Sequence, residues 1–355
     1  MVAGGPPEAA ANPAWEVRHS CCGAMGSNRL PPVFEFPDID LMIRTYQFSD
    51  MFVPSTEGAG MPKIGRFTSD ANKGVYLRAY DVAAGQWPVE FEDIDVETSF
   101  GVTRVRRSGH GAGTPLLLLP GLMGNSLFWL PLVEELSRER VVYAMDVMGW
   151  AGRCEQTAPI ADEADVAAWV GEVIAGLGAD RVHLAGYSLG AWIAAVAAAH
   201  RPDRIASLSL LEPAPATFAR PSWKVLYKFM AGGIRPTRAK MEKFNRWLSP
   251  GLELSEQMWA MLLASFEFRM SLPWARPLTA ERFAAITAPV LVLFGSETVV
   301  HDAEVAAARA RTVMPAADIE IYPGVGHEMI FAIPEQVIPR FLEFAAKHEP
   351  GRGDR

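Results

Sequence analysis

A serine within a glycine-flanked turn is the feature of the sequence that points most directly to chemistry. Ser188 lies in Gly186-Tyr187-Ser188-Leu189-Gly190, after the apolar run 182–185 and before the alanine-rich segment 189–200. A G-x-S-x-G pattern between a strand and a helix is typical of a nucleophile, because small residues on both sides let neighbouring backbone pass close by. The alternative is an ordinary surface serine in a glycine turn. We interpret Ser188 as a nucleophile at a strand end, whose following amide lies at a helix N-terminus and favours negative charge.

A serine hydroxyl needs a base to remove its proton, and His327 is the best-placed histidine. It lies in Gly324-Val325-Gly326-His327-Glu328, directly after the apolar run 319–322. That loop should be at the carboxyl edge of the sheet, where sites in open α/β sheets form. A capping or turn histidine is the alternative. We expect His183 and His200 to be structural, and His301, near a strand end, is a secondary site candidate.

Attack on a carbonyl also needs amide donors for the developing oxyanion, and losing one such donor typically costs about 10²- to 10³-fold in rate. The segment Pro120-Gly121-Leu122-Met123-Gly124-Asn125 follows a buried apolar run and opens a helix. We expect the Leu122 and Leu189 amides to form this pair. A plain strand-to-helix turn is the alternative for 120–125.

The order of apolar runs and helical segments predicts the scaffold that positions these residues. Continuous apolar runs alternate with helical segments, which indicates an α/β fold with a doubly wound, mostly parallel sheet. The alternation fails between 213 and 287, where helical pieces rich in large apolar residues form an insertion. Placed after a strand end, this insertion predicts a lid over the site. The predicted organisation is an irregular N-terminal extension (1–65), a core (66–213 and 281–346), a helical lid (214–280) and a C-terminal tail (347–355).

Composition excludes several classes of protein. The chain has 355 residues, 50% of them hydrophobic, and a formal net charge of -8, which argues against a nucleic-acid partner. Three cysteines cannot form a disulfide framework, so we expect a reducing, cytoplasmic location. No signal peptide or membrane-spanning stretch is predicted. No metal-ligand spacing is present, and we expect no metal and no cofactor. The oligomeric state is not predicted.

Residues 66–346 resemble an α/β-hydrolase fold protein. The resemblance rests on the order of the 120–125 loop, the Ser188 turn, the lid insertion and the Gly326-His327 pair. Trp87-Pro88-Val89, the 98–103 stretch and Leu211-Glu212-Pro213-Ala214 further resemble a bacterial esterase-like branch. The resemblance implies an eight-stranded sheet and a triad in the chain order serine, acid, histidine. Two departures are the Pro120-Gly121 start of the loop, where His-Gly is usual, and Cys154, where a serine is common.

The acid of the implied triad is absent from its usual position, because family members usually carry it where this chain has Thr298. A neutral threonine cannot stabilise an imidazolium. Glu212, after the apolar run 205–211, and Glu297, one residue before Thr298, are the two substitutes, and the sequence favours Glu212. Asp302 or no acid at all are the remaining alternatives. A helix cap or a lid ion pair is the structural alternative for Glu212.

Three hypotheses of function follow. The first is a serine hydrolase that cleaves an ester or thioester of a hydrophobic small molecule through a Ser-His-Glu triad and an acyl-enzyme. The second is a biosynthetic enzyme of the same fold, a cyclase or a C–C or thioester-cleaving enzyme, that acts on a hydrophobic natural product. The third is a non-catalytic ligand-binding protein. For a substrate pocket we expect contacts from Met123, Tyr187, Phe218 and Trp223.

Overall fold

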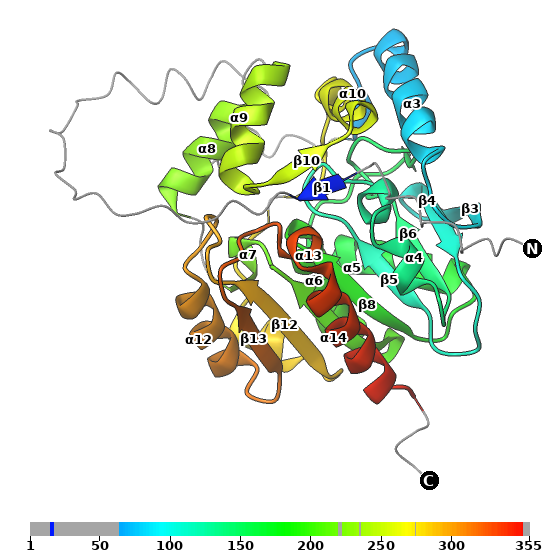
Figure 1. Cartoon of the computed structure of the whole chain (residues 1–355). Coiled ribbons are helices and arrows are strands. Elements are labelled where there is room, and N and C mark those ends of the chain that lie inside the picture. The colour runs from blue at the N-terminus through cyan, green and yellow to red at the C-terminus, as the bar shows by residue number, and fades with distance from the viewer. Residues whose placement is uncertain (1–14, 18–63, 219–221, 234–235, 274, 351–355) are drawn as a thin grey trace, which may run out of the picture.

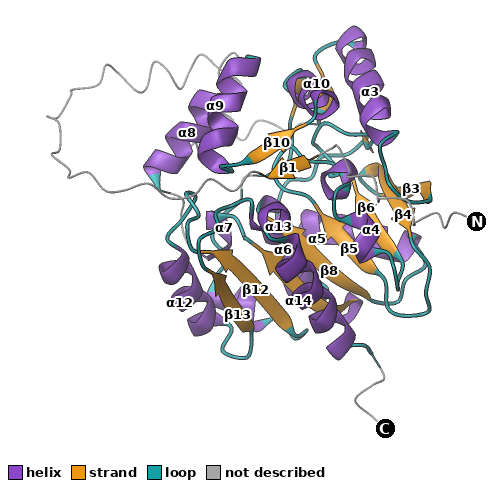
Figure 2. Ribbon diagram, viewed as in Figure 1, coloured by secondary structure: helices purple, strands orange, loops and turns teal. Residues whose placement is uncertain are grey.

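The computed structural model describes residues 15–17, 64–218, 222–233, 236–273 and 275–350 (Figure 1). A central sheet with helices on both sides forms the lower part of the view, and a group of shorter helices lies above one edge of that sheet (Figure 2). Within the described residues no helix is long and apolar enough to cross a membrane.

The main sheet has the strand order β13-β12-β9-β8-β5-β6-β4-β3, and the two-residue β7 pairs with β4. Neighbouring strands in the series β13-β12-β9-β8-β5-β6 are parallel, whereas β4 is antiparallel to both β3 and β6. The expectation of a mostly parallel sheet is therefore confirmed, with eight strands along its main path. The strands are β3 (Phe91–Thr98), β4 (Gly101–Ser108), β5 (Leu116–Leu119), β6 (Val142–Met145), β7 (Glu155–Gln156), β8 (Val182–Tyr187), β9 (Ile205–Leu211), β12 (Val290–Gly295) and β13 (Asp318–Tyr322).

Helices cover both faces of this sheet, which is why its inner strands are continuously apolar. Every residue of β5, β6, β8, β9 and β12 is buried. One face packs against α5 (Glu163–Gly176), α6 (Leu189–His200), α11 (Ala280–Ala284) and α12 (Ala303–Val313). The other packs against α3 (Asp70–Ala84), η1 (Ser126–Trp129), α4 (Val133–Leu136), α13 (Met329–Ala332) and α14 (Pro334–Lys347). A short turn, η2 (Pro202–Arg204), precedes β9.

The upper group corresponds to most of the helical insertion that the sequence predicts between 213 and 287. The insertion begins with α7 (Pro215–Phe218), which packs against α6 and α12 of the core, and continues through α8 (Trp223–Gly233), α9 (Arg238–Leu248), β10 (Leu252–Leu254), α10 (Glu256–Ser265) and β11 (Phe268–Arg269). Two short strands from the N-terminal part of the chain pair with it: β1 (Trp15–Val17) with β10, and β2 (Arg66–Phe67) with β11. Sequence patterns did not predict these pairings, because each joins segments far apart in the chain.

Most of the predicted N-terminal extension, 1–65, lies outside the described residues, and so does the end of the tail, 351–355. The first residues of the tail contact the core. Glu349 accepts a hydrogen bond from Arg140 at 2.8 Å and lies 3.4 Å from Nε2 of the fully buried His183. The same carboxylate accepts a hydrogen bond from the Thr114 amide. The chain beyond α14 is thereby attached next to β8.

Candidate active site

The turn between β8 and α6 holds Ser188 in a strained backbone conformation, with φ at 52°. The close packing behind it explains the two glycines. A Cβ on Gly186 would lie 2.2 Å from the Gly190 carbonyl oxygen, and a Cβ on Gly190 would lie 2.4 Å from the carbonyl oxygen of Pro120. The Ser188 amide donates to the Leu211 carbonyl at 3.1 Å. Any side chain at either glycine would push the turn apart.

His327 lies between Ser188 and a buried carboxylate. Its Nε2 is 3.0 Å from the Ser188 hydroxyl oxygen, and its Nδ1 is 3.3 Å from Oε1 of Glu212. The Tyr187 hydroxyl donates to the backbone carbonyl of His327, and the two rings lie 5.2 Å apart. This contact fixes the loop that carries the histidine. Burial, followed by the charges of Glu212 and Glu328, raises the pKa of Tyr187, which therefore stays a neutral donor.

Glu212 follows β9 and is fully buried. Its φ of 44° turns the chain sharply, and its amide donates to the Leu293 carbonyl at 2.8 Å. Its second carboxylate oxygen, Oε2, accepts the Gly295 amide at 2.6 Å. A buried carboxylate is tolerated only where donors surround it, and this one has a backbone amide and an imidazole.

The other carboxylates considered from sequence lie elsewhere. The Glu297 side chain is exposed and accepts a hydrogen bond from the Ser296 hydroxyl at 3.3 Å. Asp302 caps α12 by accepting the Val305 amide at 3.0 Å. Of the two glutamates, the structure brings Glu212 to His327 and leaves Glu297 facing solvent. The Thr298 hydroxyl oxygen is buried and has no hydrogen-bond partner among the described residues.

The loop after β5 lies directly against the serine. A Cβ on Gly121 would be 3.5 Å from the Ser188 Cβ, so the backbone at Leu122 is close to the nucleophile candidate. Leu189 is the first residue of α6, and its amide therefore has no partner within the helix. Leu122 and Leu189 both line a cavity that reaches Ser188. These positions suit the expected pair of amide donors.

Asp146 anchors the base of that loop. This fully buried carboxylate accepts the Ser126 amide at 2.8 Å and the Arg153 amide at 2.7 Å. Tyr80 donates to it at 3.4 Å. Burial raises the pKa of Asp146, and the hydrogen bonds from Ser126 and Arg153 oppose that rise. The carboxylate thus holds the start of η1, and with it the end of the loop that contains Leu122.

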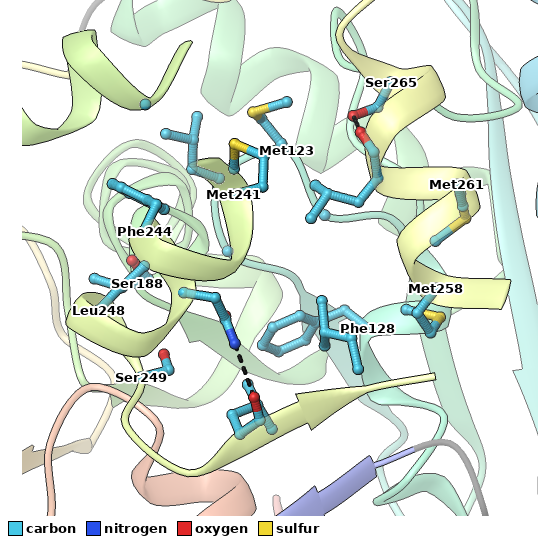
Figure 3. Close-up of a pocket in the computed structure, with 18 of the residues that line it drawn as sticks. Met123, Phe128, Ser188, Met241, Phe244, Leu248, Ser249, Met258, Met261 and Ser265 are labelled. Carbon is cyan, nitrogen blue, oxygen red and sulfur yellow. Dashed lines mark hydrogen bonds between the residues drawn. The ribbon is translucent and has the colours of Figure 1, made fainter. Parts of the chain in front are cut away.

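A mainly apolar cavity of about 230 Å³ opens above Ser188 and His327. In Figure 3, Met241, Phe244 and Leu248 of α9 face Met258 and Met261 of α10 across this space, with Phe128 below. Tyr76, Asn125, Asn245, Ser249 and Ser265 add polar atoms to its wall. A second cavity of about 110 Å³ shares Leu122, Ser188 and Phe229 with the first. Ser188 is therefore at the junction of two apolar spaces.

The four predicted substrate contacts divide into two pairs. Met123 and Tyr187 line the larger cavity. Phe218 and Trp223 line neither cavity, so the structure does not bring these two side chains to the site. Phe218 is buried in the core, stacked on Phe283 at 5.4 Å, because the short α7 points back into the domain. Trp223 is at the start of α8 with 68% of its surface exposed.

Sequence reasoning did not single out, among the apolar residues of the insertion, those of α9 and α10 that line the larger cavity. In α9 they are Met241, Phe244, Asn245 and Leu248, and in α10 they are Met258, Met261, Leu262 and Ser265. Both sets follow the i, i+3, i+4, i+7 spacing of one helix face. That periodicity was the available signal. It does not by itself distinguish a face turned to a cavity from one turned to the core.

The comparisons with known proteins agree with this geometry. Residues 116–340 match the model of a family described as the alpha/beta hydrolase family. The chain belongs to this family. It is 28% identical to carboxylesterase YbfK of Bacillus subtilis strain 168, over 76% of this chain and 93% of that protein. The crystal structure of that esterase superposes with a TM-score of 0.72 at 27% identity, covering 78% and 99% of the two chains.

A second crystal structure, that of naproxen esterase from Bacillus subtilis, superposes with a TM-score of 0.71 at 26% identity. The alignment covers 79% of this chain and 99% of that one. The family and fold predicted from sequence are thereby confirmed. Among the described residues no group of three or more histidine, cysteine or acidic side chains could hold a metal ion.

Proposed function

We propose that the chain is a carboxylesterase in which Ser188, His327 and Glu212 form the catalytic triad. The observation that carries the proposal is the position of the His327 ring, 3.0 Å from the Ser188 hydroxyl on one side and 3.3 Å from the Glu212 carboxylate on the other. A base within hydrogen-bond reach of its nucleophile and oriented by a third group is the arrangement that activates a serine. The similarity to curated carboxylesterases supports an ester-hydrolysing enzyme.

The proposed reaction has two halves. His327 takes the hydroxyl proton as the Ser188 oxygen attacks the ester carbonyl, and the Leu122 and Leu189 amides receive the oxyanion. The tetrahedral intermediate collapses when His327 returns that proton to the alkoxide, which leaves as the alcohol. A water molecule, deprotonated by His327, then attacks the acyl-serine. His327 returns this proton to the Ser188 oxygen as the acyl–oxygen bond breaks and the acid leaves. Glu212 holds the Nδ1–H of His327 throughout and stabilises the imidazolium.

The two cavities support an ester with an apolar group on each side of the carbonyl. His327 lines the larger cavity, and the smaller cavity is lined instead by Leu189, Ala214 and Val225. Because His327 must reach the leaving oxygen, the larger cavity takes the alcohol and the smaller takes the acyl group. We therefore expect bulky apolar or aromatic alcohols esterified to short acyl groups to be the preferred substrates.

The test is hydrolysis of short p-nitrophenyl esters together with labelling by a fluorophosphonate. Wild-type protein should hydrolyse the esters and incorporate one label, whereas Ser188→Ala should do neither. Hydrolysis undiminished in Ser188→Ala would refute the proposal. Labelling without turnover would instead favour the biosynthetic alternative, and absence of both in folded wild-type protein would favour a ligand-binding role.

A further inference from the structure

A second histidine shares the carboxylate that contacts His327. His301 lies in the loop between β12 and α12, and its side chain is 8% exposed. Its Nε2 is 3.8 Å from Oε1 of Glu212, and its ring lies edge-on to Phe294 with the centroids 5.5 Å apart. Neither ring nitrogen has a hydrogen-bond partner among the described residues. Leaving a buried polar group unpaired is costly, so this ring requires an explanation.

The Glu212 carboxylate offers an explanation for the unpaired His301 ring. Its Oε2 is occupied by the Gly295 amide, while Oε1 faces both imidazoles, with His327 at 3.3 Å and His301 at 3.8 Å. A carboxylate oxygen can accept more than one hydrogen bond. A small rotation of the His301 side chain would bring its Nε2–H within hydrogen-bonding distance of Oε1. The two histidines would then hold the same oxygen from two sides.

We propose that His301 is a positioning residue that donates a hydrogen bond to Oε1 of Glu212, fixes the orientation of this carboxylate, shares its charge with His327 and thereby sets the acid limit of activity. The inference rests on the proposed function, because it assigns Glu212 to the triad. His301 contacts the triad acid and takes no part in the bond-making steps. It acts only through the orientation and charge of Glu212.

The charges around His301 determine the sign of its effect. Burial lowers the pKa of His301, and the nearby His327 lowers it further. The charges of Glu212, at the end of β9, and of Asp302, in the same loop as His301, oppose that shift. The ring is therefore neutral near neutral pH and able to donate. If it gains a proton in acid, the cation opposes a second proton on His327, since coupled sites titrate as a pair. Removing His301 removes both the donor and this repulsion. Both changes favour protonation of His327, which moves the acid limb of the rate profile to higher pH.

The experiment measures kcat/KM for p-nitrophenyl butyrate against pH with the full chain and with His301→Phe and His301→Gln. The phenyl ring keeps the volume and cannot donate, whereas the glutamine amide can donate and cannot be protonated. For His301→Phe we expect the acid limb to rise by roughly half a pH unit to one unit, the equivalent of one typical hydrogen bond. We expect kcat/KM on the neutral plateau to fall by about 3- to 10-fold. The glutamine variant should recover most of the plateau and place the limb between the other two.

A matched control is His200→Gln, at the end of α6 opposite Ser188. His200 also has a buried ring nitrogen without a partner among the described residues, and burial lowers its pKa as well. This variant should keep the wild-type acid limb. If the Phe and Gln variants at position 301 lose activity equally at every pH with the limb unmoved, His301 is merely structural and the proposal is overturned. Profiles identical to wild type overturn it too.

A readout independent of turnover separates this inference from the proposed function. In protein labelled with ¹⁵N-histidine, the His327 ring signals should titrate at higher pH in His301→Phe than in wild type. If wild-type protein hydrolyses no ester and resists fluorophosphonate, the proposed function fails, and the titration still tests whether the two rings are coupled through Glu212. If the esterase is active and the titration does not move, only the inference about His301 fails. Should the Phe variant not fold, the Gln variant still tests the repulsion between the two rings, because it cannot be protonated and its acid limb should lie above that of wild type.

Discussion

The floor of the candidate site and its roof are held in different ways. The floor lies at the ends of β8 and β9 and in the 323–328 loop, and it carries the polar groups of the site. Glu212 and His327 are at most 4% exposed, and the backbone is strained at Ser188 and Glu212. The roof, made by α8, α9, β10 and α10, presents apolar side chains, and α8 and α9 have one buried residue each, Val225 and Met241. Reaction chemistry therefore depends on fixed hydrogen-bond geometry, and substrate choice depends on surfaces that can repack.

The largest effect should come from breaking the floor at its acid. Glu212→Gln keeps the shape but removes the charge that stabilises protonated His327, and we expect kcat for a p-nitrophenyl ester to fall by about 10⁴-fold. Glu297→Gln is the matched control and should retain wild-type kcat, because that side chain is exposed. An equal loss of kcat in both variants, or a larger loss in Glu297→Gln, would show that Glu212 is not the triad acid.

A stability test probes the support beneath the floor. Asp146→Asn turns an acceptor for the Ser126 and Arg153 amides into a group that can match only one of them. We expect the free energy of unfolding to fall by about 2–4 kcal/mol, measured by urea denaturation. Asp302→Asn is the control, because asparagine caps a helix as well as aspartate does. A destabilisation of the same size in both would show that Asp146 is not a special support.

Two leucines in the roof provide a matched pair for the two cavities. Leu226 lines the smaller cavity and Leu262 the larger. Leu226→Trp should lower kcat/KM about tenfold for longer acyl chains on a fixed alcohol, whereas Leu262→Trp should do so for larger alcohols on a fixed acyl group. Measuring kcat/KM for both variants on both ester series gives the four comparisons that the test needs. The opposite pattern would exchange the roles of the cavities.

The smallest effect concerns pH and the strand that carries Ser188. Burial lowers the pKa of His183 in β8 from 6.5 to about 4. The unfolded chain then binds more protons than the folded one in this window, so the His183 contribution to stability is lost as pH falls from about 6.5 to about 4. In His183→Asn the free energy of unfolding should change less steeply with pH over that range. An unchanged slope would show that other groups control the acid sensitivity.

The floor could be predicted from sequence because its signals are local. The glycines around Ser188 and the loop before His327 are each short patterns next to an apolar strand, and Glu212 directly follows one. Parallel strands in a doubly wound sheet bring these ends to one edge. The choice between Glu212 and Glu297 depended on where two loops turn, and the sequence left it open. Strand and helix order was sufficient for everything else in the floor.

The roof could not be predicted residue by residue. An amphipathic helix shows from sequence which residues share a face but not what that face meets, so Trp223 and Phe218 were chosen and Met241, Phe244 and Met261 were missed. The pairing of β1 with β10 and of β2 with β11 depends on contacts between distant segments. His301 was noted only as a histidine near a strand end. Its contact with Glu212 requires the fold itself.

Three non-glycine residues of the described chain adopt positive φ, and all three are at the site: Met123, Ser188 and Glu212. Glycine would relax each of them. A lineage no longer selected for hydrolysis could therefore gain stability by the same substitutions that abolish the chemistry. Inactive descendants of such an enzyme should be recognisable by glycine at one or more of these three positions, within an otherwise unchanged fold.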